Sequence, residues 1–200
     1  MSDEYRTINK ESTGFFKDKG SKFYSYVFPV ENEEEVKDIL VRLKKEHHSA
    51  RHHCYAWRIG TEEIKFRAND DGEPSSTAGK PILGQLQNYD VTNILLVVVR
   101  YFGGTLLGTS GLINAYKNAS IDVLNTVEIQ TKLIEKKYEL SFEYPLLNTV
   151  MQILKQEELE IINTDFKENC KLWFKVRKND AERVLQIFAD IFGVKITGGG

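Results

Sequence analysis

The chain has 200 residues, of which 41% are hydrophobic and 28% charged, and its formal net charge at pH 7 is −2. This apolar content is enough to bury one large core or two small ones, and it excludes an intrinsically disordered chain. A protein whose whole surface binds nucleic acid is usually strongly basic, so near-neutrality restricts any nucleic acid contact to a local patch.

Membrane insertion and secretion are both disfavoured by the sequence. No stretch approaches the roughly 20 apolar residues that a membrane-spanning helix needs, and the first ten residues are polar where a secretory signal has an apolar centre. Cys54 and Cys170 are too few for the disulfide framework of a small secreted protein. We therefore expect a cytoplasmic protein without membrane contact, and neither cysteine in a disulfide.

Hydrophobic periodicity and turn residues predict alternating strands and helices in the first two thirds of the chain. Asn32 is a candidate N-cap, and three glutamates after it suit the positive end of a helix dipole. The predicted elements are strand 23–28, helix 33–45, strands 54–59 and 64–67, a short helix around 82–89, a continuous apolar strand 94–99, and helix 112–127.

The last third predicts a compact unit with the order β-α-β-β-α-β, which is typical of a ferredoxin-like sandwich. Pro145 opens its first helix, and Asn179 or Asp180 caps its second, which ends near Phe192. Its strands are expected at 136–142, 160–166, 171–176 and 194–196. We therefore predict an α+β protein with two domains, residues 1–130 and 135–197.

Two loops rich in glycine and hydroxyl groups each precede a predicted helix, and Arg100 stands just before the second loop. Because helix N-termini expose unpaired N–H groups, such loops can hold an anion, phosphate above all. We interpret them as facing one cleft that binds a phosphate-like anion. The alternative is a purely structural pair of turns, with Thr77 or Ser76 as N-cap.

The candidate ligand-binding residues are Asp71, Gly72, Glu73, Pro74, Ser75, Ser76, Thr77, Ala78, Gly79, Arg100, Gly103, Gly104 and Gly108. Further candidate side chains in the cleft are His52, Cys54 and Tyr101. Neither loop matches the Walker A pattern or Gly-x-Gly-x-x-Gly, so nucleotide-hydrolysing and dinucleotide-binding functions lose their main support.

Histidines at 47, 48, 52 and 53 stand close to Cys54 and an acidic loop, which raises the alternatives of a metal site and a cysteine nucleophile. The chain has no spaced cysteine pairs and no His-Glu-x-x-His helix, so we expect no metal and no cofactor. A cysteine among apolar neighbours is more often a small buried hydrophobe than a nucleophile. Asp71 with Glu73 suits an acid–base pair, but turn chemistry is the favoured interpretation, and no residue is assigned as catalytic.

A second candidate surface lies in the C-terminal domain. Lys171, Trp173 and Lys175 alternate with three apolar residues on a predicted strand. If those apolar residues pack inward, Trp173 lies on the open face of the sheet between two lysines. We take this group as a candidate patch for a partner.

Three motifs together closely resemble the YigZ/IMPACT family. They are His52-x-Cys54-Tyr55-Ala56, the run from Asp70 to Gly79, and Val99 to Gly104 with the glycines that follow to Gly111. The resemblance spans residues from about Glu11 to Tyr116. It implies an N-terminal domain of the ribosomal protein S5 domain 2-like type, and a C-terminal domain similar to the last domain, domain V, of elongation factor G. The eukaryotic relatives are regulators of translation initiation that act through protein contacts.

The chain departs from the family pattern at two positions. Family members often carry a lysine two residues after the paired glycines and an arginine in the following helix, where this chain has Leu106 and Asn114. This leaves Arg100, Lys80 and Lys117 as the nearby cations and weakens a nucleic acid role for the cleft.

We therefore expect a non-enzymatic binding protein, a translation-associated regulator that contacts the ribosome, RNA or a translation factor through the cleft. The alternative is an enzyme that acts on a small phosphorylated or acidic metabolite bound between the two loops. In that alternative, Asp71, Glu73 or His52 would transfer the proton.

Overall fold

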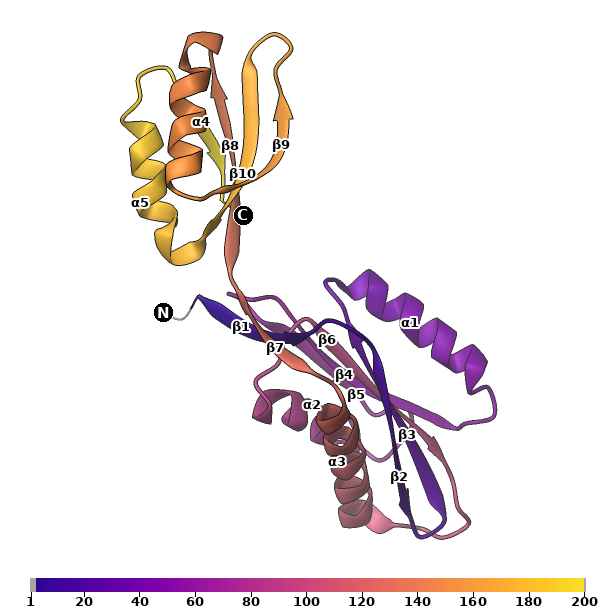
Figure 1. Ribbon diagram of the computed structural model, residues 1–200. Helices are drawn as coiled ribbons and strands as arrows, with labels where there is room; N and C mark the ends of the chain where they lie inside the picture. The colour runs from indigo at the N-terminus through magenta and orange to yellow at the C-terminus, as the bar shows by residue number, and fades with distance from the viewer. Residues whose placement is uncertain (1–2, 200) are drawn as a thin grey trace. The chain divides into compact units, whose positions relative to one another are not determined.

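A computed structural model describes residues 3–199, and it divides the chain into two compact units (Figure 1). The larger unit comprises residues 5–132, and the smaller comprises residues 133–199 with residues 3 and 4. The architecture is mixed α and β, with five α-helices in the described part of the chain. None of these helices has both the length and the apolar character that a membrane span requires.

The larger unit is built on a five-stranded antiparallel sheet of order β2-β3-β6-β4-β5. Helices α2 and α3 cover one face of this sheet, and α1 covers the other (Figure 1). Its elements are β1 (Glu4–Ile8), β2 (Ser12–Asp18), β3 (Ser21–Pro29), α1 (Glu33–Glu46), β4 (His52–Ile59), β5 (Lys65–Asn69), α2 (Gly79–Asn88), β6 (Ile94–Tyr101), α3 (Gly108–Thr126) and β7 (Ile129–Leu133).

The apolar strand predicted at 94–99 is the central strand β6, and it is buried on both faces. Alternate side chains point to opposite sides of a strand. Ile94, Leu96 and Val98 therefore join the core under α2 and α3, while Leu95, Val97 and Val99 join the core under α1. The two cores explain why this strand shows no polar alternation.

The predicted cap of the first helix is confirmed. The Asn32 side chain accepts hydrogen bonds from the backbone N–H groups of Glu34 and Glu35 at 3.1 and 3.0 Å. Val36 and Leu43 are the buried residues of α1, as the helical spacing predicts.

Strands β1, β2 and β7 were not predicted from the sequence. Strand β2 carries charged residues on an edge of the sheet, and it pairs with β3 through a tight turn at Lys19 and Gly20, which have φ of 42° and 83°. Strands β1 and β7 pair with each other in a separate two-stranded sheet, although they lie about 120 residues apart in the sequence. Short, half-exposed strands of this kind show too little alternation to stand out.

The smaller unit has the predicted order β-α-β-β-α-β, with a four-stranded antiparallel sheet of order β11-β8-β10-β9. Both of its helices pack in one core with the sheet. Its assignment to the ferredoxin-like class, like that of the larger unit to the S5 domain 2-like class, stays a prediction. The elements are β8 (Glu135–Phe142), a 3₁₀ turn (Tyr144–Leu146), α4 (Leu147–Gln156), β9 (Glu160–Asp165), β10 (Cys170–Arg177), α5 (Lys178–Ala189) and β11 (Lys195–Gly198).

Pro145 lies in the 3₁₀ turn that leads into α4, as predicted. The predicted cap of α5 is wrong. The helix begins at Lys178 with Arg177 in the N-cap position, so Asn179 and Asp180 lie in its first turn, and Arg177 makes no side-chain capping bond.

Candidate functional site

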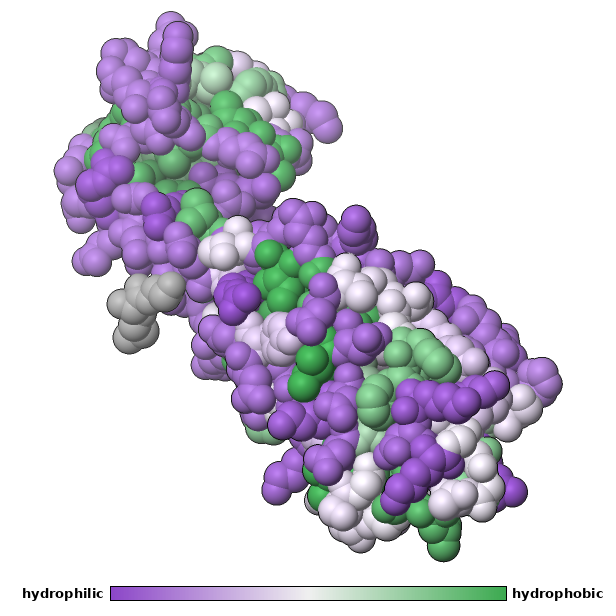
Figure 2. Space-filling view, turned by 60° about the horizontal axis from the view of Figure 1, so that its bottom comes forward, coloured by the Kyte–Doolittle hydropathy of each residue, from purple (hydrophilic) through white to green (hydrophobic). Residues whose placement is uncertain are grey.

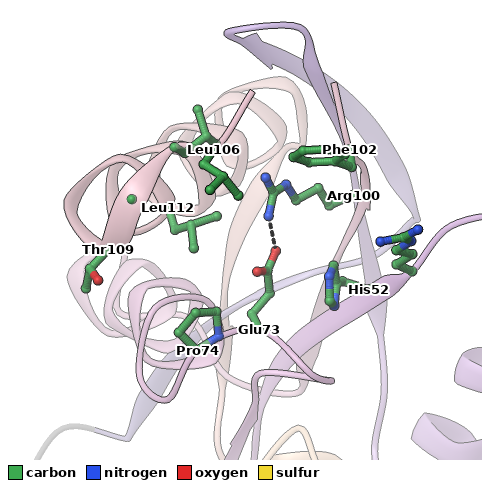
Figure 3. A pocket seen from close by; sticks show the side chains of 11 residues that line it. His52, Glu73, Pro74, Arg100, Phe102, Leu106, Thr109 and Leu112 are labelled. Carbon is green, nitrogen blue, oxygen red and sulfur yellow. Dashed lines mark hydrogen bonds and ion pairs between the residues drawn. The ribbon is translucent and has the colours of Figure 1, made fainter. Parts of the chain in front are cut away.

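The two glycine loops meet at a pocket of about 390 Å³ at one end of the five-stranded sheet (Figure 3). The first loop contributes Glu73 and Pro74, and the second contributes Phe102 and Leu106. Other lining residues come from the start of β4, the end of β6 and the start of α3. They are Arg51, His52, Arg100, Leu107, Gly108, Thr109 and Leu112.

A buried ion pair lies in this pocket (Figure 3). Arg100 Nη1 donates to Glu73 Oε1 at 2.7 Å, and the Tyr116 hydroxyl donates to the same oxygen at 2.7 Å. Arg100 Nη2 also lies 3.3 Å from Ser21 Oγ, so the guanidinium ties β6 to the start of β3. The exposed fractions of Arg100 and Glu73 are only 5% and 8%. The two buried charged groups of the pocket, Arg100 and Glu73, are therefore ion-paired with each other.

Cys54 continues this network away from the pocket. Its thiol donates to the Asp70 carbonyl oxygen at 3.0 Å and lies 3.3 Å from the Tyr116 hydroxyl. Burial raises the pKa of the Cys54 thiol far above its ordinary value, and it raises the pKa of Tyr116 as well. The thiol is therefore held in its protonated form, which is a poor nucleophile.

The amides predicted to bind an outside anion hold a carboxylate of the chain itself. The N–H groups of Ser76, Ala78 and Gly79 donate to the Asp70 side chain at 2.9, 3.0 and 2.8 Å. In the alternative of structural turns, Thr77 or Ser76 was to cap α2, and this part of the alternative is wrong because Ala78 occupies the N-cap position. The Thr77 hydroxyl instead donates to the Pro74 carbonyl oxygen at 2.6 Å. An acidic residue six to nine positions upstream is the sequence signal for this internal cap.

The carboxylates of Asp71 and Glu73 contact different groups, so they do not form the acid–base pair that the sequence raised as an option. The Asp71 carboxylate accepts the backbone N–H of His53 at 2.7 Å and lies 3.2 Å from Lys44 Nζ, on the side of the sheet that α1 covers. Its carbonyl oxygen accepts a hydrogen bond from His52 Nδ1 at 2.9 Å. Burial lowers the pKa of His53, and the charge of Asp71 opposes that shift.

Strand alternation places the neighbouring residues His52 and His53 of β4 on opposite faces of the sheet. Across residues 3–199, no group of three or more His, Cys, Asp or Glu side chains is arranged to hold a metal ion.

At several of the candidate positions, the backbone itself requires glycine. A Cβ at Gly103 would lie 1.9 Å from the carbonyl carbon of Gly20, so the turn between β2 and β3 packs directly on the second loop. A Cβ at Gly79 would lie 2.6 Å from the backbone nitrogen of Asn69. Gly72, Gly104 and Gly108 have φ of 87°, 87° and 72°, a region that side chains other than glycine rarely adopt.

A model of the Impact N-terminal domain matches residues 19–124, which contain every residue that lines the pocket. The chain belongs to the IMPACT family. It is 35% identical over 182 residues to an IMPACT family member of Haemophilus influenzae, covering 90% of this chain and 86% of that one. It is 39% identical over 153 residues to the IMPACT family member YigZ of Escherichia coli, covering 74% of each chain.

The likeness extends to a solved structure. A crystal structure described as that of a hypothetical protein has a TM-score of 0.73 to this chain at 32% identity. It covers 98% of this chain, and this chain covers 97% of it. The fold of both units is therefore shared with a known structure.

Within the IMPACT family, this chain has an apolar rim around the pocket. Leu106, which stands where the resemblance leads us to expect a lysine, is 83% exposed, and Phe102 is 47% exposed. Arg51 is the exposed cation among the lining residues, whereas Lys80 and Lys117 do not line the pocket. Sequence reasoning missed Phe102, Leu106 and Arg51, although two large apolar residues in an exposed glycine loop are a usable signal.

Tyr101, predicted in the cleft, lines a second pocket instead. This pocket of about 450 Å³ is bounded by Gly20, Lys22, Tyr24, His47, Tyr101 and Phe102. His47 bridges two tyrosines, with Nδ1 2.8 Å from the Tyr101 hydroxyl and Nε2 2.6 Å from the Tyr26 hydroxyl. Burial lowers the pKa of His47 and raises the pKa of Tyr26.

The C-terminal patch forms with the predicted alternation, but its lysines are ion-paired. The three apolar residues that alternate with the patch, Leu172, Phe174 and Val176, are buried, and Trp173 is half-buried. Lys171 pairs with Glu139 at 3.2 Å, and Lys175 pairs with Glu160 at 3.3 Å. The net positive charge that the sequence suggests for this patch is therefore neutralised.

Proposed function

We propose that this IMPACT family protein is a non-enzymatic binding protein that regulates translation. Its partner is a ribosome, an RNA or a translation factor, bound at the pocket between the glycine loops. Family membership supports this, because the eukaryotic members that the sequence resembles regulate translation initiation through protein contacts. Because translation takes place in the cytoplasm, we also propose that the protein is cytoplasmic.

The observation that carries the proposal is that the buried ionisable groups of the pocket and of the network behind it are bonded within the chain. Glu73 is bonded to Arg100 and Tyr116, and Cys54 is a buried thiol bonded to the backbone. What faces outward is apolar surface at Phe102 and Leu106 with Arg51 beside it. Such a surface suits contact with a partner better than proton transfer.

The test is co-sedimentation of the protein with ribosomes at two salt concentrations. We expect wild type to pellet with ribosomes and Leu106→Asp to pellet much less, because a carboxylate would replace an exposed apolar contact. The matched control is Val41→Asp on α1, since Val41 is also exposed at 54% and does not line the pocket. Wild type that stays in the supernatant at both salt concentrations contradicts the proposal.

One observation favours the enzyme alternative. The pocket is large enough for a small metabolite, and α3 begins at its edge with no side chain capping the N–H groups of Gly108 and Thr109. A thermal-shift screen of phosphorylated and acidic metabolites tests it. A compound that stabilises wild type but not Arg51→Gln, and that wild type converts to a product, establishes the enzyme.

A further inference from the structure

We propose that the second pocket, formed by Lys22, Tyr24, His47, Tyr101 and Phe102, binds single-stranded RNA. One base stacks among its aromatic rings, and lysines at the turn between β2 and β3 hold the adjoining phosphates. This inference rests on the proposed function, because it names RNA as the partner and adds a surface on the α1 side of the sheet.

The pocket presents aromatic rings whose positions are fixed. Tyr24 and Tyr101 meet edge to face with ring centroids 5.7 Å apart, and Phe15 packs 5.1 Å from Tyr24. The hydrogen bond between His47 Nδ1 and the Tyr101 hydroxyl holds the Tyr101 ring in place. Rings held in this way lose little conformational freedom when a base stacks on them, and stacking is the main recognition mode for single strands.

Phe102 joins this pocket to the pocket between the glycine loops, because it lines both. It is 47% exposed, and the Arg100 guanidinium lies 5.8 Å from its ring centroid on one side. A single-stranded RNA that crosses Phe102 therefore passes from the aromatic pocket toward Arg51 and the start of α3. The N-cap residue of α3 makes no side-chain capping bond, so the first N–H groups of this helix suit a phosphate.

Charge is segregated along the sheet of the larger unit. Strand β3 starts at the pocket end, as the pairing of Lys22 with Tyr101 indicates, and α1 ends there, since its C-cap residue His47 is hydrogen-bonded to Tyr101. The cations gathered at this end are Lys17, Lys19, Lys22, Lys44, Lys45 and Arg51. The neighbouring acids are Asp18 and Glu46, with Asp71, which pairs with Lys44, and Glu73, which pairs with Arg100. The opposite end carries Glu31, Glu33, Glu34 and Glu35, with Arg58 and Lys65 as cations, and Arg58 is paired with Asp90 there. A nearly neutral unit thus offers one locally positive end for phosphates.

The cations nearest the pocket are available. In the part of the chain that the structure describes, no ion pair involves Lys19, Lys22 or Arg51, whereas Lys44 pairs with Asp71. On the face of the larger unit seen in Figure 2, small apolar patches lie among hydrophilic residues. Lysines without ion-pair partners beside the aromatic rings of the pocket suit a ligand with flat apolar bases and a charged backbone.

A peptide is a weaker match for the same pocket. Peptides that bind beside a sheet gain main-chain hydrogen bonds from an exposed strand edge. The pocket lies over β3 and β6, and both strands are paired on each side, so neither offers a free edge. A nucleic acid needs no such edge, because stacking and phosphate contacts hold it.

The experiment measures fluorescence anisotropy of a labelled uridine octamer with the full chain at several salt concentrations. We expect Tyr24→Leu and Phe102→Ala each to weaken binding by about fivefold or more. The matched control is Phe66→Ala, since Phe66 is also exposed, at 59%, but lies on β5, and its affinity should equal that of wild type. Lys22→Gln should reduce the slope of log affinity against log salt by about 0.7.

The outcomes separate this inference from the proposed function. No binding of the octamer at low salt, equal binding of a duplex, or equal loss in Phe66→Ala overturns the RNA site. If wild type nevertheless pellets with ribosomes, the proposed function stands and its partner is a protein. If the octamer binds and its binding depends on Tyr24, but the protein does not pellet with ribosomes, the RNA site is supported and the ribosome is excluded as its partner. Urea unfolding of each variant shows whether a loss comes from misfolding.

Discussion

Arg100 donates a hydrogen bond to Glu73 across 2.7 Å, and both side chains are buried. The pair joins the central strand to the first glycine loop, so it holds the loop against the pocket. An ion pair this deeply buried makes removal of one partner expensive, since the other charge is left without compensation.

We expect Glu73→Gln to destabilise the protein by about 3–5 kcal/mol, because it leaves the Arg100 guanidinium buried without a counter-charge. Urea denaturation measures the change. In comparison, Glu46→Gln breaks an exposed contact with Arg42 at 3.9 Å, and its effect should stay below about 1 kcal/mol. Equal effects of the two substitutions would mean that the buried pair has no special role.

Asp70 should be important for the first loop because its carboxylate accepts three backbone N–H groups. We expect Asp70→Ala to lower the free energy of unfolding by about 1–3 kcal/mol. Amide hydrogen exchange should accelerate at Ser76, Ala78 and Gly79. If exchange there is unchanged while stability falls, Asp70 acts elsewhere.

Gly103 is required for packing whether or not it binds a ligand. Gly103→Ala would put a methyl group 1.9 Å from the carbonyl carbon of Gly20, so we expect a large loss of thermal stability. Gly84 in α2 has no atom within 4 Å of such a methyl group, so Gly84→Ala should stabilise the protein by up to about 1 kcal/mol. Tolerance of Gly103→Ala would show that the two turns separate in solution.

Stability should fall as pH drops below about 6.5, because burial lowers the pKa values of His47 and His53. A lowered folded-state pKa means that the unfolded chain binds the proton more readily, so the stabilisation is present above the unfolded pKa and is lost as pH falls. Urea denaturation at pH 7 and 5.5 measures the difference. In the double variant His47→Gln with His53→Gln, the difference in the free energy of unfolding between pH 7 and pH 5.5 should be smaller. If this difference equals that of wild type, other groups cause the pH dependence.

Both cysteines should resist thiol reagents in the folded protein, because Cys54 and Cys170 are buried and burial raises the pKa of each thiol. At pH 8 we expect no rapid labelling of the native protein by an aromatic disulfide reagent, and labelling of two thiols per chain in denaturant. A fast thiol in the native protein that disappears in Cys54→Ser would revive the nucleophile alternative.

Local sequence patterns were sufficient for the long, strongly periodic elements. The Asn32 cap, the double-sided burial of β6 and the order of elements in the smaller unit follow from neighbours along the chain. Strands β1, β2 and β7 did not follow in this way. They are half-exposed, and contacts with distant segments stabilise them: β1 and β7 pair with each other, and the Phe15 N–H of β2 donates to Asp122 of α3.

The sequence by itself determined the family, the mixed α and β architecture and the two glycine loops, because these depend on residue types at fixed spacings. Tertiary structure alone decided which groups face the ligand and which face the chain. The Asp70 carboxylate accepts hydrogen bonds from the loop amides that the sequence suggested for an outside anion, and Arg100 forms an ion pair with Glu73. Tyr101 lies on the opposite face of the sheet and lines the second pocket. The physical reason is that a buried polar group must be satisfied by whichever partner folding brings near, and that partner has no fixed distance in the sequence.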